Sequence, residues 1–301
     1  MQQPKFLQAG STIGITCPSG YIPFEQVRYA ADVLEQKGYK VKLDNTGVHD
    51  LYLSGSDGER LQGLQQMLDD EDVDVILMGR GGYGLSRIID QLNFDAFIKK
   101  PKWICGFSDV VVLLNHVQAQ FDIPVLHSPM CNAYKPETLD SDHLKSFFAA
   151  ISGDELSYSI PSNSHNRVGN AEGILTGGNL AILAHLTGSA SEVDTTGKIL
   201  FIEDVGEYLY NIDRMMLNLK RAGKLDSIAG LILGGFTDMK DTTRPFGETI
   251  EQIILEKVGE YDYPVCFNFP AGHQDINYTL CLGLHHQLKV TATGATLKLL
   301  R

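Results

Sequence analysis

The chain has 301 residues, which is enough for two domains of ordinary size, each with its own hydrophobic core. A hydrophobic content of 43% and a charged content of 21% are typical of a soluble globular protein. The formal net charge of -12 at pH 7 argues against nucleic acid and anionic membrane surfaces as partners, because their phosphates would repel the chain.

The sequence carries no sign of a membrane span, an export leader or a disulfide framework. No apolar run approaches the ~20 residues that a bilayer span needs, and the first six residues do not lead from a basic into an apolar region. The five cysteines are scattered and form no C-x-x-C pair: Cys17, Cys105, Cys131, Cys266 and Cys281. We expect small buried hydrophobes in a reducing compartment. The prediction is a cytoplasmic protein with no metal and no cofactor.

In the first half of the chain, β-type runs alternate with helical patterns. The expected strands are short and apolar: 12–16, 39–43, 73–78, 103–105 and 124–127. Helices are expected between them, one beginning at a Ser56 cap after a loop at 44–56 and another at about Leu85. This alternation predicts a parallel sheet with helices on both faces and functional residues at the carboxyl ends of its strands.

From about residue 151 the pattern changes. Residues 151–170 are polar and poor in periodicity, which predicts a linker between an N-terminal domain, 1–150, and a C-terminal domain, 171–301. Further strands are expected at 199–203, 228–234, 264–267 and 288–300, and helices at 178–186, 210–222 and 247–258. The second half is therefore predicted to be a smaller α/β domain with a β-rich end.

Ser108 is expected on the turn that connects an apolar strand to the following helix. The segment 104–111 reads I-C-G-F-S-D-V-V, so a glycine precedes the serine by two residues. Such a turn would lift the hydroxyl out of the sheet and point helix N-terminal amides toward the group that it attacks. Two interpretations remain: Ser108 is a nucleophile, or it is only the N-cap of the helix. The G-x-S-x-G pattern is incomplete, because Val110 stands in place of the last glycine.

A glycine-rich loop, G-R-G-G-Y-G at 79–84, follows the buried strand at 73–78. Glycines let backbone N–H groups approach a ligand closely, so the loop could cradle a phosphate or an oxyanion. It lacks the lysine of the G-x-x-x-x-G-K-[ST] pattern and does not fit G-x-G-x-x-G, which disfavours a nucleotide. The alternative is a tight strand–helix turn with no ligand.

Acid and base candidates lie in the second half. Glu203 ends an apolar strand and could orient an imidazole, or it is a surface acid at a strand end. His273 lies in a glycine- and proline-containing loop, and imidazole titrates near neutral pH, so it is a candidate base. His127 is a rival base at the active edge of the first domain, or a hydrogen-bonded histidine beneath the loop. His285 and His286 have no acid or cysteine pattern nearby and make a poor metal site.

Together these stretches resemble the LD-carboxypeptidases, the muramoyltetrapeptide carboxypeptidase family of serine peptidases that also contains the microcin C self-immunity proteins. The resemblance runs along nearly the whole chain and rests on these segments, in this order: G-S-T-I-G-I at 10–15, P-S-G at 18–20, R-G-G-Y-G at 80–84, G-F-S-D at 106–109, H-S-P-M at 127–130, G-G-N-L at 177–180, I-E-D-V-G-E at 202–207, I-D-R-M at 212–215, and G-H at 272–273 with Asn277.

The resemblance implies roles for particular residues. Ser108 would be the nucleophile and Glu203 and His273 the other members of the triad, in a chain order that is one of several known for this chemistry. The oxyanion hole would use the amides of Asp109 and of Gly82 or its neighbour Gly81. We further hypothesise that Arg80 and Gly81 hold the terminal carboxylate of the substrate.

The resemblance also implies a fold and an activity. The fold would be a flavodoxin-like parallel-sheet N-terminal domain with a smaller β-barrel-like α/β C-terminal domain, in a homodimer. The activity would be hydrolysis of the L,D amide bond that releases terminal D-alanine from cytoplasmic peptidoglycan tetrapeptides, through an acyl-enzyme. The substrate would thus be a muropeptide.

Two other functions compete with this one. The first is a microcin-immunity-type hydrolase of peptidyl-aminoacyl nucleotides. Members of that type tend to carry a longer insertion with aromatic residues that stack on the base, whereas this chain is compact and its single tryptophan, Trp103, lies in a strand. The second is a non-catalytic ligand-binding protein in which Ser108 is merely a cap.

Overall fold

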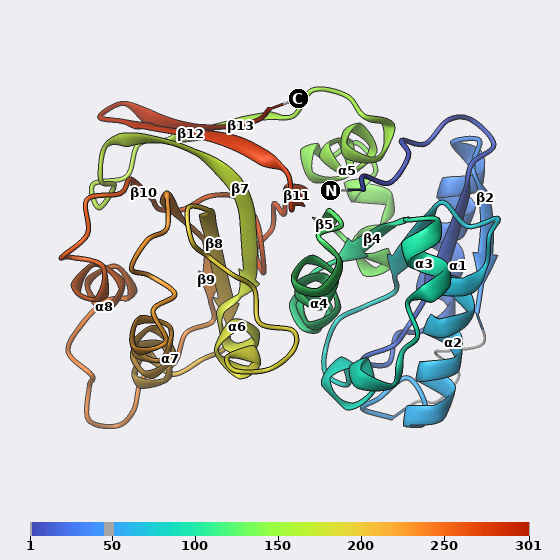
Figure 1. Ribbon diagram of the computed structural model, residues 1–301, viewed down its shortest axis with the longest axis horizontal. Coiled ribbons are helices and arrows are strands. Elements are labelled where there is room, and N and C mark those ends of the chain that lie inside the picture. The colour runs from blue at the N-terminus through green and yellow to red at the C-terminus, as the bar shows by residue number, and fades with distance from the viewer. Residues whose placement is uncertain (1, 45–50, 301) are drawn as a thin grey trace. The chain divides into compact units, whose positions relative to one another are not determined.

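The computed structural model describes residues 2–44 and 51–300. Met1, the first of the six residues inspected for an export leader, lies outside this description. So do residues 45–50, which are part of the loop predicted at 44–56. The chain divides into two compact units (Figure 1). The first comprises Met1–Glu155 with Tyr278–Leu280, and the second Leu156–Asn277 with Cys281–Arg301.

The first unit is built on a six-stranded sheet with the order β11-β5-β4-β3-β1-β2. Its strands are β1 (Thr12–Thr16), β2 (Lys40–Leu43), β3 (Val75–Met78), β4 (Trp103–Gly106), β5 (Val125–His127) and the short β11 (Leu280–Leu282), of which Leu280 belongs to this unit. The pairs β1–β2, β1–β3, β3–β4 and β4–β5 are all parallel. Every residue of β3 and β4 is buried, which explains their unbroken apolar sequences. The predicted parallel sheet is confirmed.

Within the part of the first unit that the structure describes, five α-helices accompany this sheet: α1 (Phe24–Gln36), α2 (Asp57–Asp69), α3 (Asp95–Lys99), α4 (Val111–Phe121) and α5 (Asp142–Ser152). Helix α2 begins at the predicted Ser56 cap, which forms a capping box with Glu59. The prediction of a helix from about Leu85 is wrong. That stretch forms two 3₁₀ turns, η1 (Leu85–Arg87) and η2 (Ile89–Gln91). The chain then leaves the helical path, because the Asn93 side chain accepts a hydrogen bond from the Asp95 amide.

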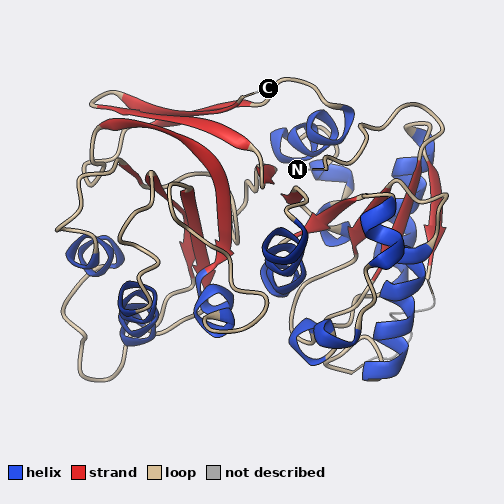
Figure 2. Ribbon diagram, viewed as in Figure 1, coloured by secondary structure: helices blue, strands red, loops and turns tan. Residues whose placement is uncertain are grey.

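The second unit is built on a seven-stranded sheet with the order β10-β9-β8-β7-β12-β13-β6. Figure 2 shows its strands in red and its helices in blue. Its strands are β6 (Ser157–Pro161), β7 (Gly169–Asn179), β8 (Ile199–Val205), β9 (Gly230–Thr237), β10 (Val265–Cys266), β12 (His285–Thr291) and β13 (Gly294–Leu299). Strands β7 to β10 pair in parallel, while β12 pairs antiparallel with β7 and β13, and β13 pairs antiparallel with β6. Arg167 and Val265 exchange two backbone hydrogen bonds of 3.0 and 3.1 Å, so the chain before β7 pairs with edge strand β10. This pairing curls the sheet toward the predicted barrel-like form.

Helices α6 (Leu180–Leu186), α7 (Leu209–Arg221) and α8 (Ile250–Lys257) pack on the parallel half of this sheet. Leu200, Met216 and Ile254 belong to one buried cluster drawn from β8, α7 and α8. Because apolar side chains at helical spacing meet the sheet, this layer forms the core of the second unit. Met216 is thus a core residue, as its spacing in the sequence indicates.

The segment 151–170, which was expected to be a linker, contains regular secondary structure. Helix α5 ends at Ser152, β6 occupies Ser157–Pro161 and β7 begins at Gly169. Strand β6 pairs with β13, with Ile160 opposite Ala295. Only Ile160 of β6 is fully buried, so the strand has little apolar signal of its own and forms through pairing with a distant segment.

Candidate functional site

Ser108 sits on a strained turn between β4 and α4. Its φ is 65°, in the left-handed region that non-glycine residues rarely adopt. The turn is the 3₁₀ helix η3 (Ser108–Val110), whose N-cap position is Phe107, while Val110 is the N-cap of α4. The N-cap interpretation of Ser108 is therefore wrong. The side chain is half-buried, at the carboxyl end of a central strand of the sheet.

The glycine loop lies directly against this serine. A Cβ added to Gly81 would lie 2.7 Å from the Ser108 Cβ and 2.9 Å from its Oγ, so only glycine permits this approach. Gly82 has a φ of 113° and Gly84 a φ of 140°, both in the region that favours glycine. The N–H of Gly20 donates to the carbonyl oxygen of Gly81 at 2.9 Å. The loop is thus shaped by glycine at each of these positions.

The side chains of Asp109 and Arg80 both tie this region together. The buried Asp109 Oδ2 accepts hydrogen bonds from the Ser19 hydroxyl at 2.6 Å and the Leu85 N–H at 3.0 Å. The exposed Arg80 donates from Nη1 to the carbonyl oxygen of Tyr21 at 2.9 Å. The turn after β1, the loop after β3 and the turn after β4 therefore meet at the carboxyl edge of the parallel sheet, as predicted.

In the second unit, Glu203 and His273 are hydrogen-bonded to each other. The fully buried Glu203 Oε2 is 2.7 Å from His273 Nδ1 and also accepts from the His273 backbone N–H at 3.1 Å. The His273 side chain is 20% exposed. Because the carboxylate engages Nδ1, the neutral ring carries its proton there and Nε2 is the basic nitrogen. The structure thus brings together two residues that are 70 positions apart in the chain.

A β-bulge places Glu203 in this position. Strands β8 and β9 pair Ile202 with Leu233 and then Asp204 with Phe236, so Glu203 faces two glycines, Gly234 and Gly235. A Cβ on Gly234 would lie 2.5 Å from the Ala271 carbonyl oxygen and 3.0 Å from the Glu203 Cβ. The missing side chain lets the His273 loop approach the strand. The Gly-Gly pair at the end of the predicted strand 228–234 was the available signal for this feature.

The His273 loop is fixed from several sides. Gly272 has a φ of 97°, and a Cβ there would lie 2.5 Å from Glu203 Oε2. The Gly272 N–H donates to the Asn277 Oδ1 at 2.8 Å, and the Thr237 hydroxyl donates to the His273 carbonyl oxygen at 2.5 Å. Thr237 was not singled out in the sequence, because nothing local indicates that the end of β9 reaches this loop.

The surroundings of His273 raise the pKa of its imidazole, so the ring binds a proton more readily than an isolated imidazole does. Burial of the ring lowers its pKa, but the hydrogen bond and negative charge of Glu203, helped by the charge of Asp204, outweigh this and leave the pKa raised above 6.5. Burial raises the pKa of Asp204 itself to about 6, despite hydrogen bonds from the Val205 and Ala181 amides and the Asn179 side chain.

His127, the rival base, lies within the first unit. Its ring is fully buried, and its centroid is 5.7 Å from that of Phe107. The imidazole that is hydrogen-bonded to the Glu203 carboxylate is that of His273, which favours His273 as the base. In residues 2–44 and 51–300, no group of three or more His, Cys, Asp or Glu side chains could hold a metal ion. All five cysteines are buried.

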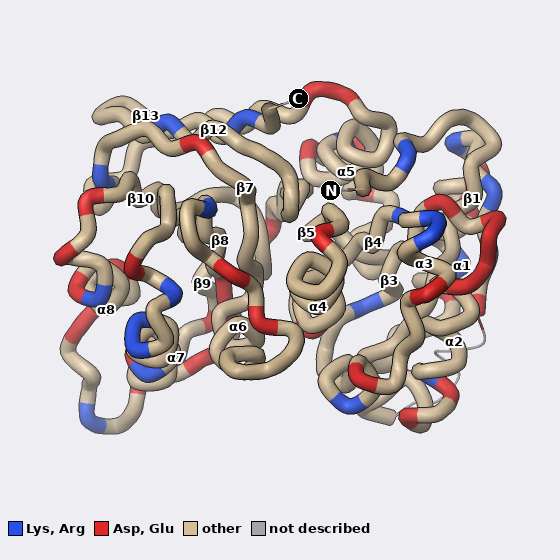
Figure 3. The backbone as a smooth tube through the Cα atoms, in the orientation of Figure 1, with Lys and Arg blue, Asp and Glu red and all other residues tan. Residues whose placement is uncertain are grey.

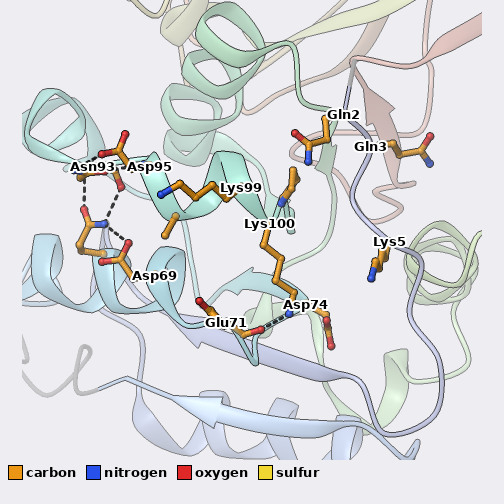
Figure 4. A pocket seen from close by; sticks show the side chains of 13 residues that line it. Gln2, Gln3, Lys5, Asp69, Glu71, Asp74, Asn93, Asp95, Lys99 and Lys100 are labelled. Carbon is orange, nitrogen blue, oxygen red and sulfur yellow. Dashed lines mark hydrogen bonds between the residues drawn. The ribbon is translucent and has the colours of Figure 1, made fainter.

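A polar pocket of about 950 Å³ occurs elsewhere in the first unit (Figure 4). Asp74, just before β3, and Lys100, shortly before β4, help to line it, so it lies at the amino-terminal edge of these strands. Its charges are mixed, and Lys100 donates to the carbonyl oxygen of Glu71. None of the candidate site residues lines this pocket.

A serine on a strained strand–helix turn and a buried carboxylate bonded to an imidazole are the parts used by hydrolases that act through an acyl-enzyme. Within the described ranges, no helix is long and apolar enough to cross a lipid bilayer. Models of the LD-carboxypeptidase N-terminal and C-terminal domains match residues 13–128 and 172–288. The chain therefore belongs to the LD-carboxypeptidase family and is a peptidase.

Named relatives agree with this assignment. A probable murein peptide carboxypeptidase of Bacillus subtilis is 33% identical over 278 residues, covering 90% of this chain and 86% of the relative. The crystal structure of the muramoyltetrapeptide carboxypeptidase from Oxalobacter formigenes matches with a TM-score of 0.87 and 28% identity, over 96% of this chain and 98% of that one. The microcin C7 self-immunity protein MccF of Escherichia coli is 26% identical over 92% of this chain and 90% of its own.

Proposed function

We propose that this peptidase is a serine-type LD-carboxypeptidase that releases terminal D-alanine from peptidoglycan tetrapeptides in the cytoplasm. The observation that carries the proposal is the 2.7 Å hydrogen bond between the buried Glu203 and His273, which is the acid–base half of a triad. The strained Ser108 turn supports the other half. The names of two relatives, a probable murein peptide carboxypeptidase and a muramoyltetrapeptide carboxypeptidase, support the substrate class.

In the proposed mechanism, Ser108 Oγ attacks the carbonyl carbon of the scissile amide while His273 Nε2 takes its proton. Glu203 holds the ring in the required tautomer and stabilises the imidazolium. The C–N bond then breaks, and His273 returns the proton to the departing amine of D-alanine. A water molecule repeats the sequence on the acyl-enzyme and regenerates the serine.

The oxyanion of each tetrahedral intermediate would be bound by the backbone amides of Asp109 and Gly82. Gly81 remains the alternative to Gly82, because both belong to the loop that packs on Ser108. An oxyanion donor of this kind is worth about 3–4 kcal/mol in a serine protease. The absence of a side chain at both glycines is what would allow a substrate carbonyl to reach the amides.

An exopeptidase must also recognise a free terminal carboxylate. We propose that Arg80, together with the Gly81 amide, binds this group. The Arg80 guanidinium is exposed and uses Nη1 to hold the Tyr21 carbonyl oxygen, which fixes its direction. A guanidinium has five N–H donors, so a carboxylate can bind through the others.

The decisive experiment compares peptides that differ only at the C-terminus. We expect hydrolysis of the tetrapeptide ending in D-alanine, and loss of most of kcat/KM for its C-terminal amide and for the peptide ending in L-alanine. Mass spectrometry of a muramyl tetrapeptide panel gives the products. Comparable rates on the acid and the amide would instead indicate an endopeptidase or a general amidase.

The second candidate, hydrolysis of peptidyl-aminoacyl nucleotides, is favoured by the similarity to the microcin C7 self-immunity protein. Trp103 does not support it, because that side chain is fully buried and its indole N–H donates to the Lys5 carbonyl oxygen at 3.0 Å. Cleavage of such a nucleotide faster than the tetrapeptide would favour this candidate.

A ligand-binding protein without catalysis would leave Ser108 unlabelled by a serine-reactive phosphonate. The homodimer that the resemblance implies can be tested by light scattering.

A further inference from the structure

The Asp109 side chain joins three segments that surround Ser108. Its Oδ2 accepts the Ser19 hydroxyl from the turn after β1 and the Leu85 N–H, which directly follows the glycine loop. Asp109 itself is the residue next to Ser108. Asp109 and its two partners, Ser19 and Leu85, are all buried, so water does not compete for these hydrogen bonds.

Further hydrogen bonds extend the connection. The Ser19 carbonyl oxygen accepts from the Ser54 N–H at 3.1 Å, and the neighbouring Gly20 N–H donates to the Gly81 carbonyl oxygen at 2.9 Å. The glycine loop is therefore held at both ends: at Gly81 through the turn after β1, and at Leu85 through Asp109. Between these two anchors lies Gly82, with its φ of 113°.

Packing alone does not require a carboxylate here. Removing a carboxylate from water is costly, and within the described part of the chain Asp109 Oδ1 has no hydrogen-bond partner. An apolar side chain would avoid that cost. An apolar side chain could not, however, accept hydrogen bonds from the Ser19 hydroxyl and the Leu85 N–H. These bonds fix two different loops beside Ser108, whose φ is 65°.

We propose that the Asp109 carboxylate is a positioning residue for the oxyanion hole. It holds the glycine loop and the Ser108 turn in register, so that the two backbone amides converge on the developing oxyanion. This inference rests on the proposed serine mechanism. It assigns to the Asp109 side chain a role separate from that of the Asp109 backbone amide.

The test uses the full-length enzyme with three substitutions, Asp109→Ala, Asp109→Asn and Ser19→Ala. We expect Asp109→Ala to lower kcat by about 10²- to 10³-fold, as for loss of an oxyanion donor, with KM nearly unchanged. Asp109→Asn should recover most of this loss, because its amide oxygen can accept from both Ser19 and Leu85. Ser19→Ala should cost less than Asp109→Ala and add little to it in the double variant. Asp90→Ala, at an exposed acid in the same unit, is the control.

The rate at which a phosphonate labels Ser108 gives a second readout, because it reports the oxyanion hole without depending on peptide specificity. We expect slow labelling of Asp109→Ala and near-normal labelling of Asp109→Asn. If the wild-type chain is not labelled, the serine mechanism and this inference both fail. If the wild type is labelled and Asp109→Ala keeps its kcat and labelling rate, only the inference is overturned. Equal damage by Asn and Ala would also overturn it. Should Asp109→Ala not fold, a wild-type kcat in Ser19→Ala would be decisive against it.

Discussion

At Ser108 a single backbone conformation determines where the proposed nucleophile points. A non-glycine residue in the left-handed region costs about 1–3 kcal/mol, so the surrounding structure must enforce it. The close approach of Gly81 on one side and the anchored Asp109 on the other provide this enforcement. The strain therefore belongs to the fold of the first unit and is present before any substrate binds.

Substitution of the triad tests the roles proposed for single residues. Ser108→Ala and His273→Ala should each lower kcat by about 10⁶-fold, and the double variant should be little worse, because the two residues act as one unit. Glu203→Gln should cost less, since the amide can still contact the ring. Steady-state kinetics on the tetrapeptide measures all four. Equal damage from His127→Ala in a protein that folds normally would contradict the assignment of the base.

The pH dependence follows from the raised pKa of His273. The ring must be neutral to accept the serine proton, so kcat/KM should rise with pH and reach half its plateau above pH 6.5. In Glu203→Gln the carboxylate that favours the imidazolium is gone, and the midpoint should move to lower pH. The measurement is a pH profile of kcat/KM for both proteins. An unchanged midpoint would show that Glu203 does not set the pKa of His273.

Residue-level features were predictable only where the signal is local. The glycine at 106 and the strand–helix change placed Ser108 on its turn correctly. The cap alternative could not be dismissed from sequence, because serine is common at both kinds of position. The hydrogen bond between Ser19 and Asp109 joins residues 90 positions apart, so it emerges only when β1 and β4 enter the same sheet.

At the scale of elements, strands with their own apolar signal were predicted and strands formed by pairing were not. β8 and β9 lie close to the predicted 199–203 and 228–234. β7, by contrast, is rich in glycine and polar residues. It is stabilised by its antiparallel partner β12, more than 100 positions further along the chain. The bulge that turns Glu203 toward His273 likewise depends on the register between two strands.

Gly234→Ala tests whether the bulge positions the acid–base pair. The added methyl would meet the Ala271 carbonyl oxygen and the Glu203 Cβ, so the His273 loop has to shift. We expect a loss of stability of about 1–3 kcal/mol from overpacking and a fall in kcat/KM of about 10²-fold from misplacement of the base. Denaturant unfolding and kinetics measure the two effects.

The matched control is Gly58→Ala. Gly58 is the second residue of helix α2, and a Cβ there would meet nothing within 4 Å. This substitution should raise the stability by less than about 1 kcal/mol, because the position is in the first turn, and leave kcat/KM unchanged. Full activity in Gly234→Ala would mean that the loop tolerates the shift and that the bulge does not matter for catalysis.

At the scale of the whole molecule, the strand and helix order of the first unit was predictable because each βα unit is contiguous in sequence. The exception is residues 278–280, which return to the first unit from the far end of the chain. No local pattern indicates that return. Ser108 belongs to the first unit, and Glu203 and His273 belong to the second.

The net charge of -12 gives a prediction about substrate capture. Acidic and basic residues occur along the backbone of both units (Figure 3), and the sequence has 37 acidic against 25 basic residues. A tetrapeptide with several carboxylates is repelled by such a field at low salt. Raising the ionic strength from about 0.01 M to about 0.15 M shortens the screening length from about 30 to about 8 Å. We therefore expect kcat/KM for the tetrapeptide to rise with salt, opposite to the behaviour of an enzyme that attracts its substrate electrostatically.

Arg80 makes this prediction sharper. If Arg80 binds the terminal carboxylate, it opposes the overall repulsion locally, so Arg80→Gln should lower kcat/KM and make the rise with salt steeper. The C-terminal amide should show a weaker salt dependence than the acid, because it carries one charge fewer. Kinetics at several salt concentrations, with sucrose as a control for viscosity, would measure these slopes. A fall in kcat/KM with salt that disappears in Arg80→Gln would mean that this one cation, and not the charge of the whole chain, governs substrate capture.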